Sequence, residues 1–172
     1  MATNIEIKAK VNDLEQLKAI VEQLSDTPGV VLTQEDTFFH TPQGRLKLRR
    51  LAPDHGQLIY YVRADSYGPK RSDYLIATSS EPDKLKEVLT AAWGIGGVVR
   101  KQRLLYKVGG TRIHLDEVDG LGSFVELEVV LSAGENVQEG QAIATELMAQ
   151  LGIAASDLVA TAYLDLLQQR QI

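Results

Sequence analysis

The chain contains no cysteine and no long uninterrupted run of apolar residues. The first absence excludes disulfide bridges, thiolate metal ligands and cysteine nucleophiles. The second leaves no stretch of about 18 apolar residues, so we expect no membrane span and no membrane partner. The sequence passes from Met1 directly into an alternating segment without an apolar signal region, and we therefore expect a cytoplasmic protein.

Basic residues are outnumbered, with 18 lysines and arginines against 23 aspartates and glutamates, and the net charge is −5. Proteins that bind nucleic acid in general are usually basic, so nucleic acid is not an expected partner. The two signs are unevenly distributed along the chain. Acidic residues are frequent in the predicted helices, whereas lysines and arginines concentrate in the predicted strands. A basic lining inside an acidic shell would suit a small anionic ligand.

Strict alternation of polar and apolar residues is the main structural signal. In the segment 4–10, polar side chains stand at even positions and apolar or small ones at odd positions, which is typical of a half-buried strand. Related segments predict eight strands, over residues 3–11, 29–40, 45–52, 57–65, 71–79, 97–108, 111–118 and 123–132. At 172 residues the chain predicts a single domain over 1–172 with a buried core.

Four helices are predicted between and after these strands. Their signals are the capping box Asn12-x-x-Glu15, Ser80 with Pro82, Asn136 with Gly152 as the stop, and Ser156 capping a helix through Gln168. Gly109-Gly110 between two strands is the turn signal of an antiparallel hairpin. The mixed order of elements, with mostly antiparallel hairpins, predicts the α+β class.

Charged side chains share one face on several predicted strands, as Lys47 and Arg49 do. Eight strands are about the number that closes a barrel, and these faces could then line its interior. The alternative turns them to solvent around an ordinary apolar core. Patterning alone favours the alternative, because a charged strand face is usually solvated. Enclosing unpaired charges is also strongly destabilising. An inward arrangement is tolerable only if the cavity is wet, the charges are paired or a polyanion binds.

Several other polar residues carry no clear functional pattern. His40, His55 and His114 lack the spacing of zinc ligands, so structural or solvent-exposed roles are expected. Lys70-Arg71 follows Gly68-Pro69 and predicts a solvated loop, with a mobile basic loop over phosphates as the alternative.

Six segments in order along the chain carry a family resemblance. They are Asn4-x-Glu6-x-Lys8, Gly44-Arg45-x-Lys47-x-Arg49, Tyr61-x-Arg63, Lys101-Gln102-Arg103-x-x-Tyr106, His114 to Glu128 with Asp116, Gly120-Leu121-Gly122 and Glu126, and Ala162-Tyr163-x-Asp165. Together they resemble the CYTH superfamily, which contains class IV adenylyl cyclases and thiamine or inorganic triphosphatases. The resemblance spans nearly the whole chain. It implies an eight-stranded antiparallel tunnel-like β-barrel with charged residues inside and about four flanking helices.

The resemblance also implies roles for individual residues. Metal binding would fall to four acidic residues, Glu6, Glu126, Glu128 and Asp116, whose oxygens suit Mg²⁺ or Mn²⁺. Substrate phosphates would be bound by seven basic residues, Lys8, Lys10, Lys47, Arg49, Arg63, Lys101 and Arg103. The implied catalytic set is Glu6, Lys8, Arg49 and Glu126. One departure is Asn4, which stands at the first glutamate of the signature and supplies an oxygen without a charge.

The implied reaction is a metal-dependent conversion of ATP to cyclic AMP and pyrophosphate. The segments around Gly120 and Lys101 look more like class IV cyclases than like short triphosphatases, which carry an aromatic where Ala9 stands. Two alternatives stay open. One is a triphosphatase acting on inorganic, nucleoside or thiamine triphosphate, and the other is a non-catalytic binder of polyphosphate or nucleotide, which Asn4 favours. The expected partner is ATP or another triphosphate, and a homodimer is one open oligomeric state.

Overall fold

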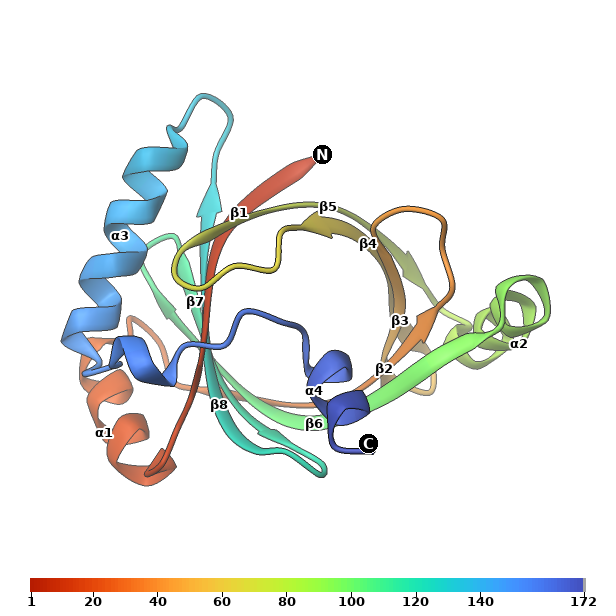
Figure 1. Ribbon diagram of the computed structural model, residues 1–172, viewed down its shortest axis with the longest axis horizontal. Helices are drawn as coiled ribbons and strands as arrows, with labels where there is room; N and C mark the ends of the chain where they lie inside the picture. The colour runs from red at the N-terminus through yellow and green to blue at the C-terminus, as the bar shows by residue number, and fades with distance from the viewer. Residues whose placement is uncertain (172) are drawn as a thin grey trace.

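The computed structural model describes residues 1–171 and contains an antiparallel β-barrel of eight strands that closes on itself (Figure 1). The strands are β1 (Ala2–Lys10), β2 (Val30–Phe39), β3 (Arg45–Ala52), β4 (His55–Arg63), β5 (Lys70–Ser79), β6 (Ile95–Val108), β7 (Thr111–Val118) and β8 (Gly122–Leu131). Their order around the barrel is β1-β5-β4-β3-β2-β6-β7-β8. The predicted α+β class and eight-stranded barrel are confirmed, and every predicted strand boundary lies within two residues of the observed one.

The barrel is charged inside, and its outer face is apolar on β1, β7 and β8. Because successive side chains of a strand alternate between its faces, β1 directs Glu6 and Lys8 into the barrel and Ile5 and Ile7 out of it. The outward apolar residues of β1, β7 and β8 form the main hydrophobic core of the molecule. The solvent-facing arrangement that patterning alone favours is therefore wrong, and the inward arrangement implied by the family resemblance is confirmed.

Helices α1 (Leu14–Leu24) and α3 (Val137–Gln150) cover the apolar outer face of β1, β7 and β8 (Figure 1). Helix α3 approaches β1 closely at Gly140, where an added Cβ would lie 2.8 Å from the side chain of Ile5. Helix α1 begins one residue later than predicted, because its N-cap is Asp13, whose carboxylate accepts the Gln16 N–H at 3.0 Å. Asn136 caps α3 as predicted.

Helix α2 (Pro82–Trp93) lies on the other side of the barrel, against β2, β3 and β4 (Figure 1). Its first turn contains Pro82, as predicted, and Gly56 allows the close approach because an added Cβ there would lie 2.6 Å from Pro82. Among residues 1–171, no helix is both long and apolar enough to cross a membrane.

The C-terminal segment crosses one end of the barrel (Figure 1). A short 3₁₀ turn, η1 (Ala155–Asp157), is followed by extended backbone and then by α4 (Tyr163–Gln169). The predicted continuous helix from Ser156 through Gln168 is therefore wrong. The reason is that carbonyl groups of residues 159–161 accept hydrogen bonds from the buried ammonium groups of Lys8 and Lys70, so they are not paired within a helix.

Candidate functional site

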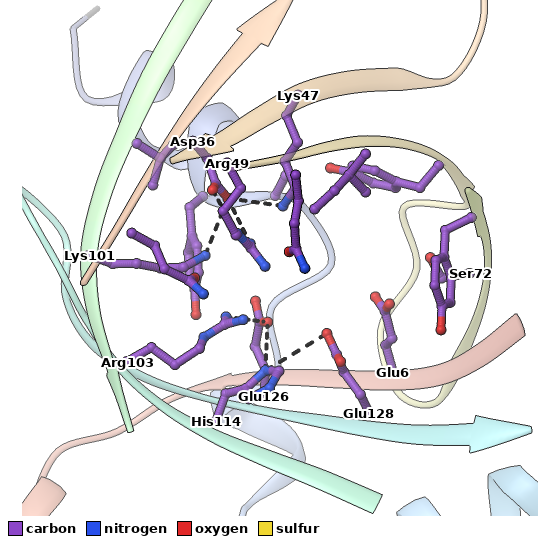
Figure 2. Close-up of a pocket in the computed structure, with 18 of the residues that line it drawn as sticks. Glu6, Asp36, Lys47, Arg49, Ser72, Lys101, Arg103, His114, Glu126 and Glu128 are labelled. Carbon is purple, nitrogen blue, oxygen red and sulfur yellow. Dashed lines mark hydrogen bonds and ion pairs between the residues drawn. The ribbon is translucent and has the colours of Figure 1, made fainter. Parts of the chain in front are cut away.

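The barrel encloses a cavity of about 280 Å³ that all eight strands and the start of α4 line (Figure 2). Seven cationic side chains face it, from Lys8, Lys47, Arg49, Arg63, Lys101, Arg103 and Arg112. Four carboxylates face it as well, from Glu6, Asp36, Glu126 and Glu128. The lining thus carries three more positive than negative charges, although the whole chain carries −5. A concave site with that excess attracts small anions.

A cationic group on β3 and β6 surrounds the buried carboxylate of Asp36 on β2 (Figure 2). Arg49 donates to both carboxylate oxygens at 2.8 Å, Lys47 donates to one at 3.0 Å, and the Lys101 ammonium lies 3.6 Å away. Burial alone would raise the pKa of Asp36, but these three cations outweigh it and hold the pKa well below its ordinary value. One carboxylate therefore holds three cations together, and they retain donors for a further anion.

The charged forms of the buried lysines in the cavity are destabilised, so the pKa values of these side chains are lowered. Burial, together with the nearby Arg103, lowers the pKa of Lys101 to about 7. Burial also lowers the pKa of Lys8 and of Lys47, against the attraction of their carboxylate neighbours. A bound polyanion would favour the charged form of all three side chains, so polyanion binding and protonation are coupled here.

Asp116 binds the Arg103 guanidinium and lies outside the cavity lining. Arg103 donates to both oxygens of that carboxylate at 2.7 Å, and the Tyr163 hydroxyl donates to one of them at 2.7 Å. Asp116 is completely buried and does not line the cavity. The structure places the Asp116 carboxylate outside the cavity lining, which differs from the expectation that it is a metal ligand there. Its observed contacts orient Arg103, which also reaches Glu126 at 2.9 Å.

An acidic group on β1 and β8, made by Glu6, Glu126 and Glu128, faces the cationic group across the cavity (Figure 2). Each glutamate has a cationic neighbour. The pairs are Glu6 with Arg63 at 2.9 Å, Glu126 with Lys8 at 3.3 Å and Glu128 with Arg112 at 2.8 Å. Burial and the neighbouring Glu128 raise the pKa of Glu6. Burial acts in the same direction on Glu126, but Lys8 and Arg103 outweigh it and hold its pKa well below the ordinary value.

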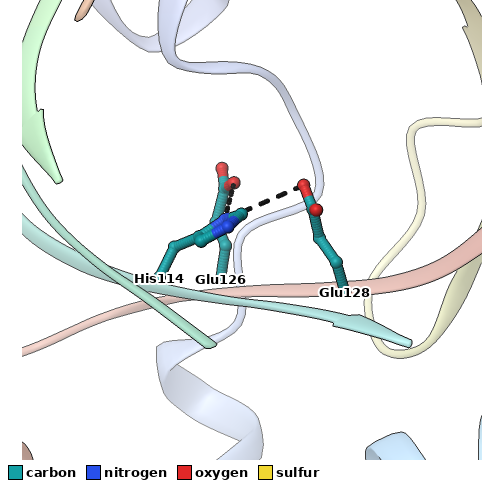
Figure 3. Close-up of side chains that lie close together, drawn as sticks. All are labelled: His114, Glu126 and Glu128. Atoms are coloured by element: carbon teal, nitrogen blue, oxygen red, sulfur yellow. Dashed lines mark ion pairs between the residues drawn. The ribbon is translucent and has the colours of Figure 1, made fainter. Parts of the chain in front are cut away.

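His114 lies between two of these glutamates (Figure 3). Its Nδ1 is 3.9 Å from Glu126 Oε2 and 3.8 Å from Glu128 Oε1, and potential ligand atoms of the three residues lie within 4.8 Å of one another. The Nδ1 atom is buried and has no hydrogen-bond partner among the described residues. Two carboxylates and an unpaired ring nitrogen fit a divalent cation. The expectation that His114 is merely structural or exposed overlooked this position.

Most of the predicted site residues meet in this cavity. Those that line it are Glu6, Lys8, Lys47, Arg49, Arg63, Lys101, Arg103, Glu126 and Glu128. Lys10 is an exception, since it is exposed at the end of β1 and does not line the cavity. Asn4 does line it, and its amide oxygen accepts a hydrogen bond from Tyr74 at 3.2 Å. Metal and phosphate roles for these residues stay predictions.

The cavity lining also includes Asp36, Arg112 and Tyr163, to which the sequence assigned no role. Lys70 is buried and binds the carbonyls of Val159 and Ala160, so the predicted solvated loop is wrong at this residue, although Arg71 is exposed. Tyr163 closes the cavity beneath the ammonium groups, with Lys8 Nζ 4.0 Å from its ring centroid.

The end of the cavity away from α4 is apolar on one side only, because the farthest lining residues on β1, β4, β7 and β8 are Asn4, Gln57, Arg112 and Glu128. The lining residues farthest from α4 on β2, β3, β5 and β6 are Leu32, Leu51, Ile76 and Leu105. Ile76 remains 48% exposed, so this end reaches the surface. The cavity therefore combines a charged interior with a mouth that has an apolar side and a polar side.

A CYTH domain model matches residues 2–163. The adenylate cyclase CyaB of Aeromonas hydrophila is 22% identical over 175 residues, which cover 96% of this chain and 88% of that protein. The PH1012 protein of Pyrococcus horikoshii OT3 superposes with a TM-score of 0.83 at 25% identity, over 95% of this chain and 98% of that chain. HpAC1 from Hippeastrum, for which a dominant triphosphatase activity is described, matches with a TM-score of 0.68 at 16% identity, over 100% and 97%.

Proposed function

The chain belongs to the CYTH domain family, and on that premise we propose that it converts ATP to cyclic AMP and pyrophosphate inside the barrel. The family includes adenylate cyclases and triphosphatases, acts on triphosphates and is metal-dependent. The proposal goes further by naming the substrate, the reaction and the residues.

The observation that carries the proposal is the division of the cavity into two charged walls. Lys47, Arg49 and Lys101 converge from one side, and His114, Glu126 and Glu128 face them from the other (Figure 2). A triphosphate between these walls would receive guanidinium and ammonium donors along its chain. The surplus of positive charge in the lining would be neutralised by the same ligand.

The chemistry requires charge stabilisation at the departing pyrophosphate. The ribose 3′-oxygen forms a bond to the α-phosphorus, the bond from that phosphorus to the bridging oxygen breaks, and the hydroxyl proton is released to solvent. Arg49, Arg103 and Lys101 would stabilise the charge that develops on the pyrophosphate. Glu126 and Glu128 would hold a divalent cation, which when bound offsets phosphate charge. The buried Asp116 would keep the Arg103 guanidinium in position.

The apolar side of the mouth supports a nucleoside triphosphate over inorganic triphosphate. A nucleoside base could bury apolar surface there against Leu32, Leu51, Ile76 and Leu105. An inorganic phosphate chain has no apolar surface to bury. The relationship to the adenylate cyclase CyaB, which extends over 96% of the chain, supports the same choice.

A triphosphatase is the second candidate, and a specific feature favours it. The cations are concentrated in the interior, so they could bind a phosphate chain with the nucleoside left outside. Hydrolysis would need only a water at the terminal phosphorus. The activity described for HpAC1 agrees with this alternative.

Substrates that lack the 3′-hydroxyl or the whole nucleoside distinguish the cyclase from the triphosphatase. Cyclisation requires the 3′-hydroxyl, so 3′-deoxy-ATP should be inert and tripolyphosphate should release little phosphate, while ATP gives cyclic AMP. Equal phosphate release from ATP, 3′-deoxy-ATP and tripolyphosphate would replace the cyclase with the triphosphatase. Binding of all three without turnover would leave a non-catalytic binder.

A further inference from the structure

The most unusual feature of the cavity is an imidazole among its carboxylates. His114 projects from β7 toward Glu126 and Glu128 of the neighbouring β8, and its buried Nδ1 has no hydrogen-bond partner among residues 1–171 (Figure 3). Distances of 3.8 and 3.9 Å to the carboxylate oxygens are too long for hydrogen bonds. A buried nitrogen without a partner is destabilising, so its position requires an explanation.

We propose that His114 Nδ1 is a metal ligand together with Glu126 and Glu128, and that this nitrogen makes the site prefer Mn²⁺ to Mg²⁺. The inference rests on the proposed metal-dependent function and deepens it by naming the ion. It assigns a role to a residue that the acidic signature does not contain.

The distances permit a shared ion. Two atoms that each lie about 2.1 Å from one ion can be separated by up to about 4.2 Å. His114 Nδ1 is within that limit of an oxygen on each glutamate. The whole set lies within 4.8 Å, so small side-chain movements would complete it. Glu6 is not in the set.

The ligand chemistry decides the ion. Mg²⁺ is a hard cation that takes oxygen ligands and gives up its water reluctantly. Mn²⁺ accepts carboxylates equally well and lies in the transition series, whose ions gain more from nitrogen ligands. A site of two carboxylates and one imidazole should therefore bind Mn²⁺ more tightly than Mg²⁺.

Titration with Mn²⁺ in the absence of nucleotide tests the selectivity. Free Mn²⁺ is followed by its electron paramagnetic resonance signal, and Mg²⁺ is measured by competition. The His114→Asn variant replaces the nitrogen with a small amide and should weaken Mn²⁺ binding by about tenfold or more. Its Mg²⁺ affinity should change by less than about twofold, because an amide oxygen suits Mg²⁺. His40→Asn, at an exposed residue outside the cavity, is the matched control and should behave like wild type.

An equal loss of both ions in His114→Asn would show a merely structural role and overturn the proposal, as would unchanged Mn²⁺ affinity. A second measurement needs no variant. Pulsed electron paramagnetic resonance of Mn²⁺ bound to wild-type protein should show coupling to an imidazole ¹⁴N nucleus, and absence of that coupling would also overturn it. Both experiments omit ATP, so their outcome is independent of whether the cyclase proposal survives.

Discussion

Neutralising Asp36 should destabilise the barrel strongly, because that carboxylate holds three buried cations. Asp36→Asn keeps the shape of the side chain but removes the charge from contacts of 2.8 Å with Arg49, 3.0 Å with Lys47 and 3.6 Å with Lys101. Breaking a buried ion pair on one side typically costs about 3 to 5 kcal/mol. Because the side chains of Lys47 and Arg49 remain partly exposed, solvent should screen the released cations in part, and we expect about 3 kcal/mol.

The assay is thermal and urea unfolding at pH 7, with and without tripolyphosphate. A loss of about 3 kcal/mol should lower the Tm by about 6 to 12 °C in a chain of this size. Tripolyphosphate should restore more stability to Asp36→Asn than it adds to wild type, because the variant offers more unpaired positive charge to the anion.

Asp83→Asn is the matched control for this substitution. Asp83 also pairs with an arginine, Arg50 at 2.8 Å, but its side chain is 63% exposed. Its Tm should stay close to that of wild type. The reasoning about the cationic group would be refuted if Asp36→Asn unfolded at the same temperature as Asp83→Asn.

Three further outcomes are expected. Glu126→Gln should still fold, with a lower Tm because Lys8 and Arg103 lose their carboxylate partner. It should lower turnover with Mg²⁺ at least about 100-fold, since it removes an anionic oxygen that would hold the divalent cation; wild-type rates from the folded variant would end its assigned role. Tripolyphosphate should raise the Tm of wild type more than that of Arg49→Ala, and an equal rise with charge-matched sulfate would reduce the effect to general screening. Because the pKa of Lys101 is lowered to about 7, its positive charge is present below pH 7 and lost above it. The affinity of the wild-type protein for tripolyphosphate, measured by calorimetry, should therefore fall between pH 6 and pH 8.5 more steeply than the affinity of Lys101→Arg. Identical pH profiles would contradict the role of Lys101.

The strands could be predicted from the sequence because alternation is a local property. Residues 4–10 and 45–52 show it plainly, and the observed strands follow it closely. The direction of each face could not be predicted in this way, because a period of two is the same whichever face points inward. The choice depends on which face α1 and α3 cover, and this is settled by contacts between distant parts of the chain.

Two residues of the site were not identified from the sequence, for different reasons. His114 could have been found, since Arg112, His114 and Asp116 alternate with apolar neighbours as the other lining residues do. The expectation of a structural role rested instead on the lack of zinc-ligand spacing around His114. Asp36 offered less signal, because Glu35 beside it is also acidic and only the closed barrel shows which of the two faces inward.

The C-terminal segment could not be predicted from local signals. Ser156 is a credible helix cap, and the apolar spacing after it suits a helix. Tertiary hydrogen bonds from Lys8 and Lys70, far away in the sequence, instead hold the backbone before Tyr163 extended. Such contacts override local preference, and they position Tyr163 at the cavity.

The most direct test of the proposed function is ³¹P nuclear magnetic resonance of ATP incubated with the protein and Mn²⁺ or Mg²⁺. The proposal predicts that the three ATP resonances are replaced by those of a cyclic phosphodiester and of pyrophosphate, in equal amounts. ADP with orthophosphate, or an unchanged ATP spectrum with either ion, would contradict it.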